Sequence, residues 1–133
     1  MTVARVDQGM AAAAASVIPP DVDRELRTRY RQLRVMLHSA GLAATYAYIA
    51  SKAGDRGPLE RAYRDAALGI RRRLAEAGLL NGEPRALTVR EMMTQLGAMD
   101  PVQYARASTE AAAFAGWLSR LADAVWQERS DRA

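Results

Sequence analysis

Helix start and stop signals recur along the whole chain, and they constrain its fold more than any other feature of the sequence. Pro19 and Pro20 end an alanine-rich first segment, because proline cannot continue a helix. Asp21 or Asp23 can cap the next helix through its carboxylate, and Gly41 offers the left-handed residue that often ends one. Signals of this kind predict helices over residues 3–17, about 22–40, 42–53, 58–77, 88–98 and 101–128.

The starts of the last two predicted helices are the most distinctive. Thr88 and Glu91 form a capping box, in which the hydroxyl accepts a bond from one amide at the helix start and the carboxylate accepts from another. Asp100 precedes a proline at the first position of the longest helix, and Gln103 holds its capping-box position. Before them, residues 79–85 contain Asn-Gly and Pro, which predict the longest loop.

No segment shows the alternation of apolar and polar residues that is typical of a strand, and no repeat recurs at a fixed period. At 133 residues the chain is long enough for one domain and too short for two of ordinary size. We therefore predict an all-α fold, a single compact bundle of five to six helices with a long C-terminal helix. The domain spans residues 1–133, with the alanine-rich helix at about 3–17, the main bundle at about 22–128 and a frayed tail at 129–133.

Apolar residues at three- and four-residue spacing predict which helix faces are buried. The chain has 28 alanines, so its core has few large side chains and requires closely approaching helices. Trp117 and Trp126 flank the apolar stripe of the last helix. The stripes consist of Leu26, Tyr30, Leu33 and Leu37 in the second helix, Leu59, Tyr63, Ala67, Ile70 and Leu74 in the fourth, and Tyr104, Ala107, Ala111, Phe114, Leu118, Leu121 and Val125 in the last.

The chain offers little for catalysis or metal binding. It has no cysteine, which excludes disulfides, thiolate metal sites and thiol nucleophiles. Its single histidine, His38, lies near a predicted helix end, where an interaction with the helix dipole is the ordinary explanation. Asp21 and Asp23 fit helix caps better than a metal site, and the glycines at 54–57 and 81–82 match no phosphate-binding motif. We predict that the protein is not an enzyme and has no catalytic residue, no metal, no cofactor and no small-molecule substrate.

No apolar run approaches the roughly 20 residues that a membrane-spanning helix needs. The run at residues 10–18 is dominated by alanine, and no net positive charge precedes it, so it makes a poor secretory signal. We expect a cytoplasmic protein that has no membrane partner.

Positive charge is concentrated in two segments. The chain carries 19 basic residues against 15 acidic ones, and every basic residue except Lys52 is an arginine. Residues 21–40 hold five arginines against three acids, and residues 56–76 hold six against three. From Glu83 onward, six arginines stand against seven acids. This distribution is expected of a protein that presents one face to a polyanion.

Each of the two segments places four of its arginines on one helix face. At about 100° of rotation per residue, the row on each helix falls within an arc of about 100° that avoids the apolar stripe. Guanidinium groups suit phosphate oxygens, and such contacts hold a nucleic acid without reading its sequence. No surface aromatic residue is interleaved with the rows, so we expect phosphate contacts without base stacking. The candidate nucleic-acid-binding residues are Arg24, Arg27, Arg31 and Arg34 in the first row, Arg61, Arg64, Arg71 and Arg72 in the second, and Lys52.

Two segments resemble a known family. Gly41–Lys52, with the sequence GLAATYAYIASK, resembles the GLxxTLAFLxSK helix of the small, all-helical subunit of the type III-B CRISPR effector, the Cmr complex. The segment from Leu96 to Ala124 is similar to that family's closing helix, whose pattern is roughly YRxATxEALxFLxWLKRFAEA. The likeness covers the chain from about Arg24, and the residues before Pro19 match only loosely. Ser119 stands where the family usually has lysine, so one basic group is missing from the last helix.

The resemblance implies a non-catalytic structural subunit of an RNA-guided antiviral complex. Several copies of such subunits stack as an inner filament beside the subunits that carry the crRNA, and they hold the target RNA paired to the guide. The implied partners are the large cyclase-type subunit, the backbone subunits, further copies of the chain itself, and the crRNA and target RNA. Head-to-tail stacking needs two complementary surfaces on each copy, and the last helix and residues 79–90 are candidates for one of them.

The residues by themselves leave three alternatives open. A solvated surface in a protein from a GC-rich genome would show the same arginines and alanines. A free-standing helical regulator would bind nucleic acid, although no helix-turn-helix signature is evident. A protein-only helical adaptor would use its arginines to bind acidic partners, and it would bind no polynucleotide at low salt.

Overall fold

The computed structural model describes residues 3–132, with the side chains of residues 7–131. Helices and their connecting loops make up this whole range, in which no strand occurs. The helices are Val3–Val17 (α1), Arg24–Ala40 (α2), Leu42–Lys52 (α3), Pro58–Glu76 (α4), Val89–Ala98 (α5) and Pro101–Arg132 (α6). The predicted all-α fold with a long C-terminal helix is confirmed.

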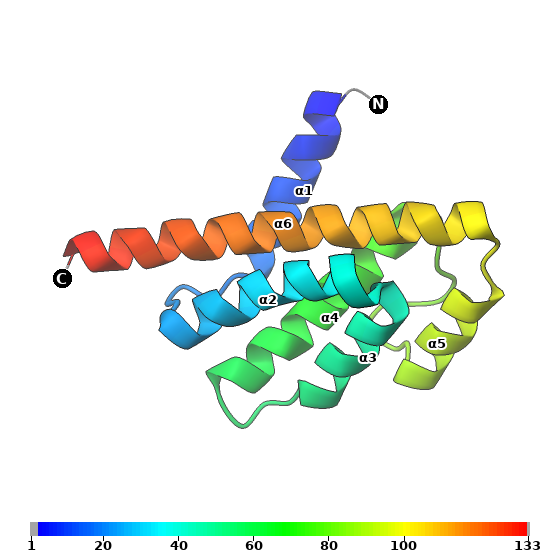
Figure 1. Ribbon diagram of the computed structural model, residues 1–133, viewed down its shortest axis with the longest axis horizontal. Coiled ribbons are helices and arrows are strands. Elements are labelled where there is room, and N and C mark those ends of the chain that lie inside the picture. Colours follow the sequence, from blue (N-terminus) through cyan, green and yellow to red (C-terminus); the bar gives the residue numbers. More distant parts are fainter. Residues whose placement is uncertain (1–2, 133) are drawn as a thin grey trace.

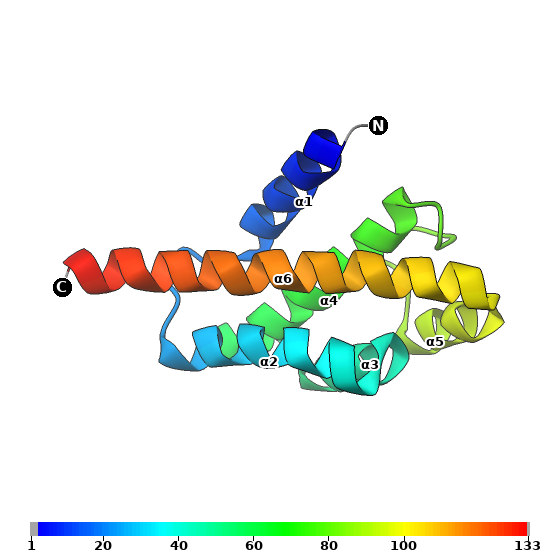
Figure 2. The ribbon, with the colours of Figure 1, turned by 45° about the horizontal axis from the view of Figure 1, so that its top comes forward.

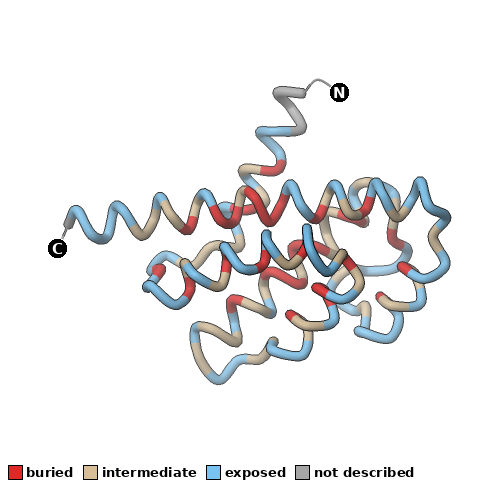
Figure 3. The backbone as a smooth tube through the Cα atoms, viewed as in Figure 1, coloured by how far each residue is buried: buried red, intermediate tan, exposed pale blue. Residues whose placement is uncertain are grey.

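The bundle is organised around α6, which runs along the long axis of the molecule (Figure 1). α2 lies beside α6 and runs in the opposite direction (Figure 1, Figure 2). α1 crosses α6 and its N-terminal part projects from the body, while α3, α4 and α5 lie on the same side of α6 as α2 (Figure 1). Buried residues gather where the other helices meet the middle of α6, and the C-terminal end of α6 is exposed (Figure 3).

The predicted caps form at the starts of three helices. The Asp23 carboxylate accepts a hydrogen bond of 2.8 Å from an amide in the first turn of α2. Thr88 and Glu91 make both bonds of the capping box at α5. Asp100 and Gln103 exchange the same two bonds at the start of α6. These helix starts were predictable because each cap lies within four residues of the helix that it begins.

The start of α3 is completed by a side chain from another helix. Its N-cap is Gly41, which has a φ of 93° and no side chain to accept a bond from the first turn. The Tyr104 hydroxyl of α6 accepts that bond from the Ala43 amide at 3.0 Å. α3 is therefore held against the first turn of α6 by a contact between residues far apart in the sequence.

The buried faces of α2 and α6 largely match the prediction. α2 buries Leu26, Tyr30, Leu33 and Leu37. α6 buries Ala107, Ala111, Phe114 and Leu118 as predicted, together with Ala115 and Ala122, whereas Tyr104, Leu121 and Val125 are half-buried. Trp117 and Trp126 are also half-buried, as expected of residues at the edges of the stripe.

α4 buries smaller residues than predicted. Leu59 and Tyr63 are half-buried, and the buried positions of the helix include Ala62 and Gly69. A Cβ atom at Gly69 would overlap the Phe114 ring of α6, so the absence of a side chain lets the two helices approach closely. The alanine-rich composition is therefore used in close helix contacts.

α6 extends beyond residue 128, where the sequence predicted the helix to end and a frayed tail to begin. α6 continues to Arg132, and Ala133 lies outside the described residues. Arg129 explains part of the extension, because its guanidinium lies 3.4 Å from the Asp21 carboxylate and donates to the Val22 carbonyl at 3.3 Å. These contacts tie the last turns of α6 to the segment between α1 and α2.

Candidate nucleic-acid interface

The first arginine row lies along the side of α2 that faces α6. Arg27 Nε donates to the Asp123 carboxylate at 2.8 Å, and Arg31 Nη2 lies 3.1 Å from the same oxygen. The Arg27 guanidinium also lies over the Trp126 ring, 5.6 Å from its centroid. One carboxylate of α6 therefore engages two of the four arginines predicted on α2.

Asp123 is ionised in this arrangement. The hydrogen bond from Arg27 is the main cause that lowers the pKa of Asp123, with Arg31 adding to it and partial desolvation opposing it. The Asp123 side chain is 39% exposed and that of Arg31 is 51% exposed. Because the cluster is open to solvent, a phosphate group can reach both arginines and compete with Asp123 for them.

Arg24 and Arg34, at the two ends of the same row, are in a different situation. Both are exposed. Within the described range, no hydrogen bond or ion pair engages either guanidinium. Arg24 and Arg34, which have no internal partner, thus flank the two arginines that share Asp123.

An open groove of about 1200 Å³ lies between α2 and α6, and we call it the α2–α6 groove. Small residues, among them Ala112 and Gly116, form much of its α6 side. Its basic groups are Arg31, Arg34, His38 and Arg120, and its acidic groups are Asp7 and Asp123. Since Asp123 is already paired, the unpaired charge of the groove is mainly positive.

The second row, on α4, is largely engaged by the fold itself. Arg71 Nε donates to the Pro84 carbonyl at 2.6 Å, and its Nη1 donates to the Tyr46 hydroxyl at 2.8 Å. Arg71 is half-buried and Tyr46 is buried. These bonds hold the loop of residues 77–88 against α3 and α4, so the Arg71 guanidinium stabilises the fold.

The other arginines of the second row have partners close by in the sequence or are partly covered. Arg61 Nη1 donates to the carbonyl of Asp55 at 3.3 Å, and Arg64 Nε lies 3.3 Å from the Asp65 carboxylate. Arg72 is half-buried, with no polar partner for its guanidinium in the described part of the chain. The second row therefore has its partners in α3, α4 and the loops around α4, whereas the first row has its partner in α6.

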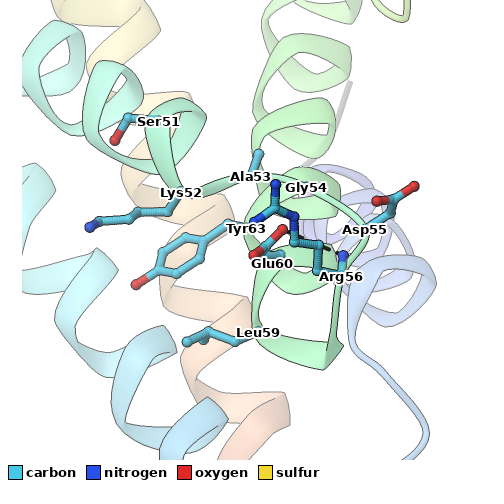
Figure 4. A pocket seen from close by; sticks show the side chains of 9 residues that line it. All are labelled: Ser51, Lys52, Ala53, Gly54, Asp55, Arg56, Leu59, Glu60 and Tyr63. Atoms are coloured by element: carbon cyan, nitrogen blue, oxygen red, sulfur yellow. Dashed lines mark hydrogen bonds between the residues drawn. The ribbon is translucent and has the colours of Figure 1, made fainter.

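Lys52 borders a pocket of about 550 Å³ between the end of α3 and the start of α4 (Figure 4). Its Nζ lies 5.7 Å from the centroid of the Tyr48 ring, which meets the Tyr63 ring edge-on at 6.2 Å. Lys52 and Tyr63 extend to one side of the pocket and Asp55 to the other (Figure 4). Burial, followed by a hydrogen bond with Tyr48, raises the pKa of Tyr63. Because Asp55 and Glu60 also line this pocket, its charge is mixed.

Comparison with known protein families places the chain. The family model of the CRISPR-associated protein Cas_Cmr5 matches residues 6–125, which is most of the sequence. The chain belongs to the Cas_Cmr5 family. This finding confirms the resemblance to the small subunit of the Cmr, or type III-B, CRISPR complex. A search of curated proteins and a search of solved structures give no match.

The Cas_Cmr5 match extends further toward the N-terminus than the resemblance did. The likeness was stated from about Arg24, whereas the match begins at residue 6 and includes most of α1. The helix that projects from the body is therefore part of the family's common sequence. Within the described residues, no helix combines the length and the apolarity that crossing a membrane would require.

The sequence of this Cas_Cmr5 protein shows no surface aromatic residue interleaved with the two arginine rows, but the fold brings aromatic residues of α6 against two arginines. Arg27 lies over Trp126, and Arg120 lies over Trp117 at 5.6 Å from the ring centroid. Arg120 was not among the predicted site residues, although its three-residue spacing from Trp117 could have indicated the contact. Ser119, where lysine was expected, is buried, so the exposed cation of this turn is Arg120.

Proposed function

We propose that this Cmr-complex subunit is a structural, non-catalytic protein that binds the phosphate backbone of the target RNA paired to the guide. The binding surface is the arginine row of α2 together with the α2–α6 groove. The observation that carries the proposal is that Arg24 and Arg34 are exposed and have no partner among the described residues, and that Arg34 lines a groove whose unpaired charge is mainly positive. We place this activity in the cytoplasm, in antiviral defence.

The mechanism is electrostatic positioning. Arg24 and Arg34 meet phosphates first, and Arg27 and Arg31 exchange Asp123 for a phosphate when the strand settles into the groove. Contacts of this kind carry no sequence information, which suits a complex in which the guide RNA selects the target. Each copy contributes only a few phosphate contacts, so a single copy binds weakly and at low salt, and higher affinity comes from several copies aligned along one strand.

Catalysis in the complex belongs, in this proposal, to other subunits. The chain has no cysteine, and its single histidine, His38, is exposed in the last turn of α2. His38 lines the groove together with Arg31, Arg34 and Arg120, and arginines suit anion binding. Membership of a family that supplies a small subunit to a larger complex agrees with this division of work.

We also propose that copies stack head to tail into a filament. Stacking needs apolar surface that a single copy leaves uncovered. Val89, in the predicted region 79–90, is 45% exposed, and Val102, at the start of α6, is 71% exposed. If these residues lie in the contact between copies, Val102→Glu lowers the number of small subunits per assembled complex, measured by native mass spectrometry. An unchanged number would remove Val102 from the contact.

The phosphate-binding proposal is tested by reversing the charge of the two arginines on α2 that have no internal partner. We expect the double variant Arg24→Glu/Arg34→Glu to keep its helical circular dichroism spectrum and to abolish retention of target RNA by the reconstituted complex. The matched control is Arg56→Glu/Arg64→Glu, which changes net charge by the same amount at two exposed residues that lie outside both the groove and the region 79–90. The control should retain RNA nearly as well as the unmodified protein.

The outcomes separate the remaining alternatives. Equal loss in both double variants would show that net charge, rather than the α2 row, controls retention. Full retention by Arg24→Glu/Arg34→Glu would overturn the proposal. A third outcome would favour the protein-only adaptor. In that case Arg24→Glu/Arg34→Glu fails to assemble with other subunits, and the unmodified chain binds no RNA at low salt.

A further inference from the structure

Arg120 and Trp117 form a cation–π pair on the side of α6 that lines the α2–α6 groove. The Arg120 guanidinium carbon lies 5.6 Å from the centroid of the Trp117 ring. Arg120 is exposed, and no hydrogen bond or ion pair engages it within the described range. Trp117 is half-buried and packs against the core, so it provides a fixed support for the guanidinium. The indole thus supports the guanidinium of Arg120 through a cation–π contact, and the exposed side chain leaves the guanidinium accessible to a ligand.

The surroundings of this pair leave room for a ligand. Both residues line the α2–α6 groove, with Arg31 and Arg34 on its α2 side. On α6, the wall of the groove next to this pair is built from small residues, and a Cβ atom added at Gly116 would meet no atom within 4 Å. A planar group lying on Arg120 would thus face two arginines across open space.

The charge of the groove favours one kind of occupant. Among the described residues, its arginines without an internal partner are Arg34 and Arg120. Asp123 is held by Arg27 and Arg31, so Asp7 is the one acid left to oppose them and the unpaired charge stays positive. An anion with a flat aromatic part complements this combination, because guanidinium planes stack on bases and their edges bind phosphate. A nucleotide has both parts, whereas an acidic peptide segment offers only the charge.

We propose that Arg120, supported by Trp117, is a stacking platform for an unpaired nucleobase of an RNA strand whose neighbouring phosphates bind Arg34 and Arg31. This inference rests on the proposed function and adds a base contact to the phosphate contacts. Stacking is tolerant of base identity, since every base has a π face. The site therefore holds a strand in register without selecting its sequence.

The test compares two strands that carry the same phosphates. The full-length chain is titrated at low salt with a short single-stranded RNA and with a strand of equal length whose central nucleotides are abasic. Arg120→Lys keeps the charge and removes the planar group, and Arg90→Lys makes the same change at an exposed arginine of α5. We expect the unmodified chain and Arg90→Lys to prefer the base-bearing strand by about 5-fold or more, within the range of one stacked base.

Arg120→Lys should lose that preference and bind the abasic strand as tightly as the unmodified chain does. Equal affinity of the unmodified chain for both strands, or an unchanged preference in Arg120→Lys, would overturn the stacking platform and leave phosphate binding intact. Failure of both strands to bind would refute the proposed function, and the platform with it. If instead Arg120→Lys changes only the self-association of the chain, the surface is a protein contact and the inference is wrong.

Fluorescence gives an independent readout. The chain has two tryptophans, so Trp126→Phe leaves Trp117 as the only tryptophan whose fluorescence is recorded. A base that stacks on Arg120 should change the Trp117 emission, and the abasic strand should change it much less. An identical change with both strands would contradict base stacking at this position. Circular dichroism of Trp126→Phe checks that the helical content is retained.

Discussion

The arginine rows of α2 and α4 are similar in sequence and differ in what the fold provides to each of them. On α2, two arginines share Asp123 at the edge of an open groove, and Arg24 and Arg34 have no internal partner in the described range. On α4, Arg71 is held by the Pro84 carbonyl and the Tyr46 hydroxyl. Spacing along a helix shows which face an arginine occupies, but its acceptors decide whether it is free to bind a ligand.

The nature of the acceptors makes the difference sharper. Asp123 is a charged acceptor on an exposed surface, where an ion pair contributes little and a phosphate can replace it. Pro84 and Tyr46 offer neutral acceptors to a half-buried guanidinium, and removal of the arginine would leave a buried hydroxyl without its partner. We therefore assign ligand binding to the α2 row and loop anchoring to Arg71.

The largest expected effect is on stability at Arg71. Arg71→Met keeps much of the apolar stem and removes both hydrogen bonds, so we expect the free energy of unfolding to fall by about 2 to 3 kcal/mol. Arg72→Met is the matched control, because its guanidinium has no polar partner among the described residues. Its effect should stay within about 0.5 kcal/mol in urea denaturation. Equal effects of the two variants would remove the distinction between the rows.

The second effect concerns RNA binding at Asp123. Asp123→Asn releases Arg27 and Arg31, so we expect single-stranded RNA to bind several-fold more tightly in a low-salt titration. Stability should fall by about 1 kcal/mol or less, since the pairs are exposed. Glu110→Gln changes the same charge elsewhere on α6 and should alter binding less. Weaker binding in Asp123→Asn would mean that the carboxylate orients the arginines for RNA rather than competing with it.

The smallest effect is the pH dependence of the same cluster. Because the fold lowers the pKa of Asp123, its contribution to stability is present above the ordinary aspartate value of 3.8 and is lost as the pH falls below it. The difference in unfolding free energy between the unmodified chain and Asp123→Asn should be constant from about pH 5 to 7 and shrink toward pH 3. A difference that grows on acidification would contradict the lowered pKa.

Local signals predicted most of the fold. The helices and three of their starts follow from caps, prolines and glycines that lie next to the helix ends. The exceptions involve residues distant in the chain. Tyr104 completes the start of α3, and Arg129 holds the end of α6 to the segment before α2. No spacing rule within a single helix reveals such contacts.

The candidate site was less predictable for the same reason. The α2 row could be identified from helical spacing, but its partner Asp123 lies 96 residues from Arg27. The acceptors of Arg71 come from a loop and from α3, so its structural task was hidden. Arg120 was missed because the last helix is electrically balanced overall, and only its contact with Trp117 distinguishes it.

The salt dependence of RNA binding tests the central claim most directly. For a single-stranded nucleic acid, the slope of log affinity against log salt concentration is about −0.7 per phosphate contact. If Arg24 and Arg34 each bind a phosphate, Arg24→Gln/Arg34→Gln should reduce the magnitude of that slope by about 1.4 relative to the unmodified chain. Parallel slopes for the two proteins would show that these arginines do not contact the phosphate backbone.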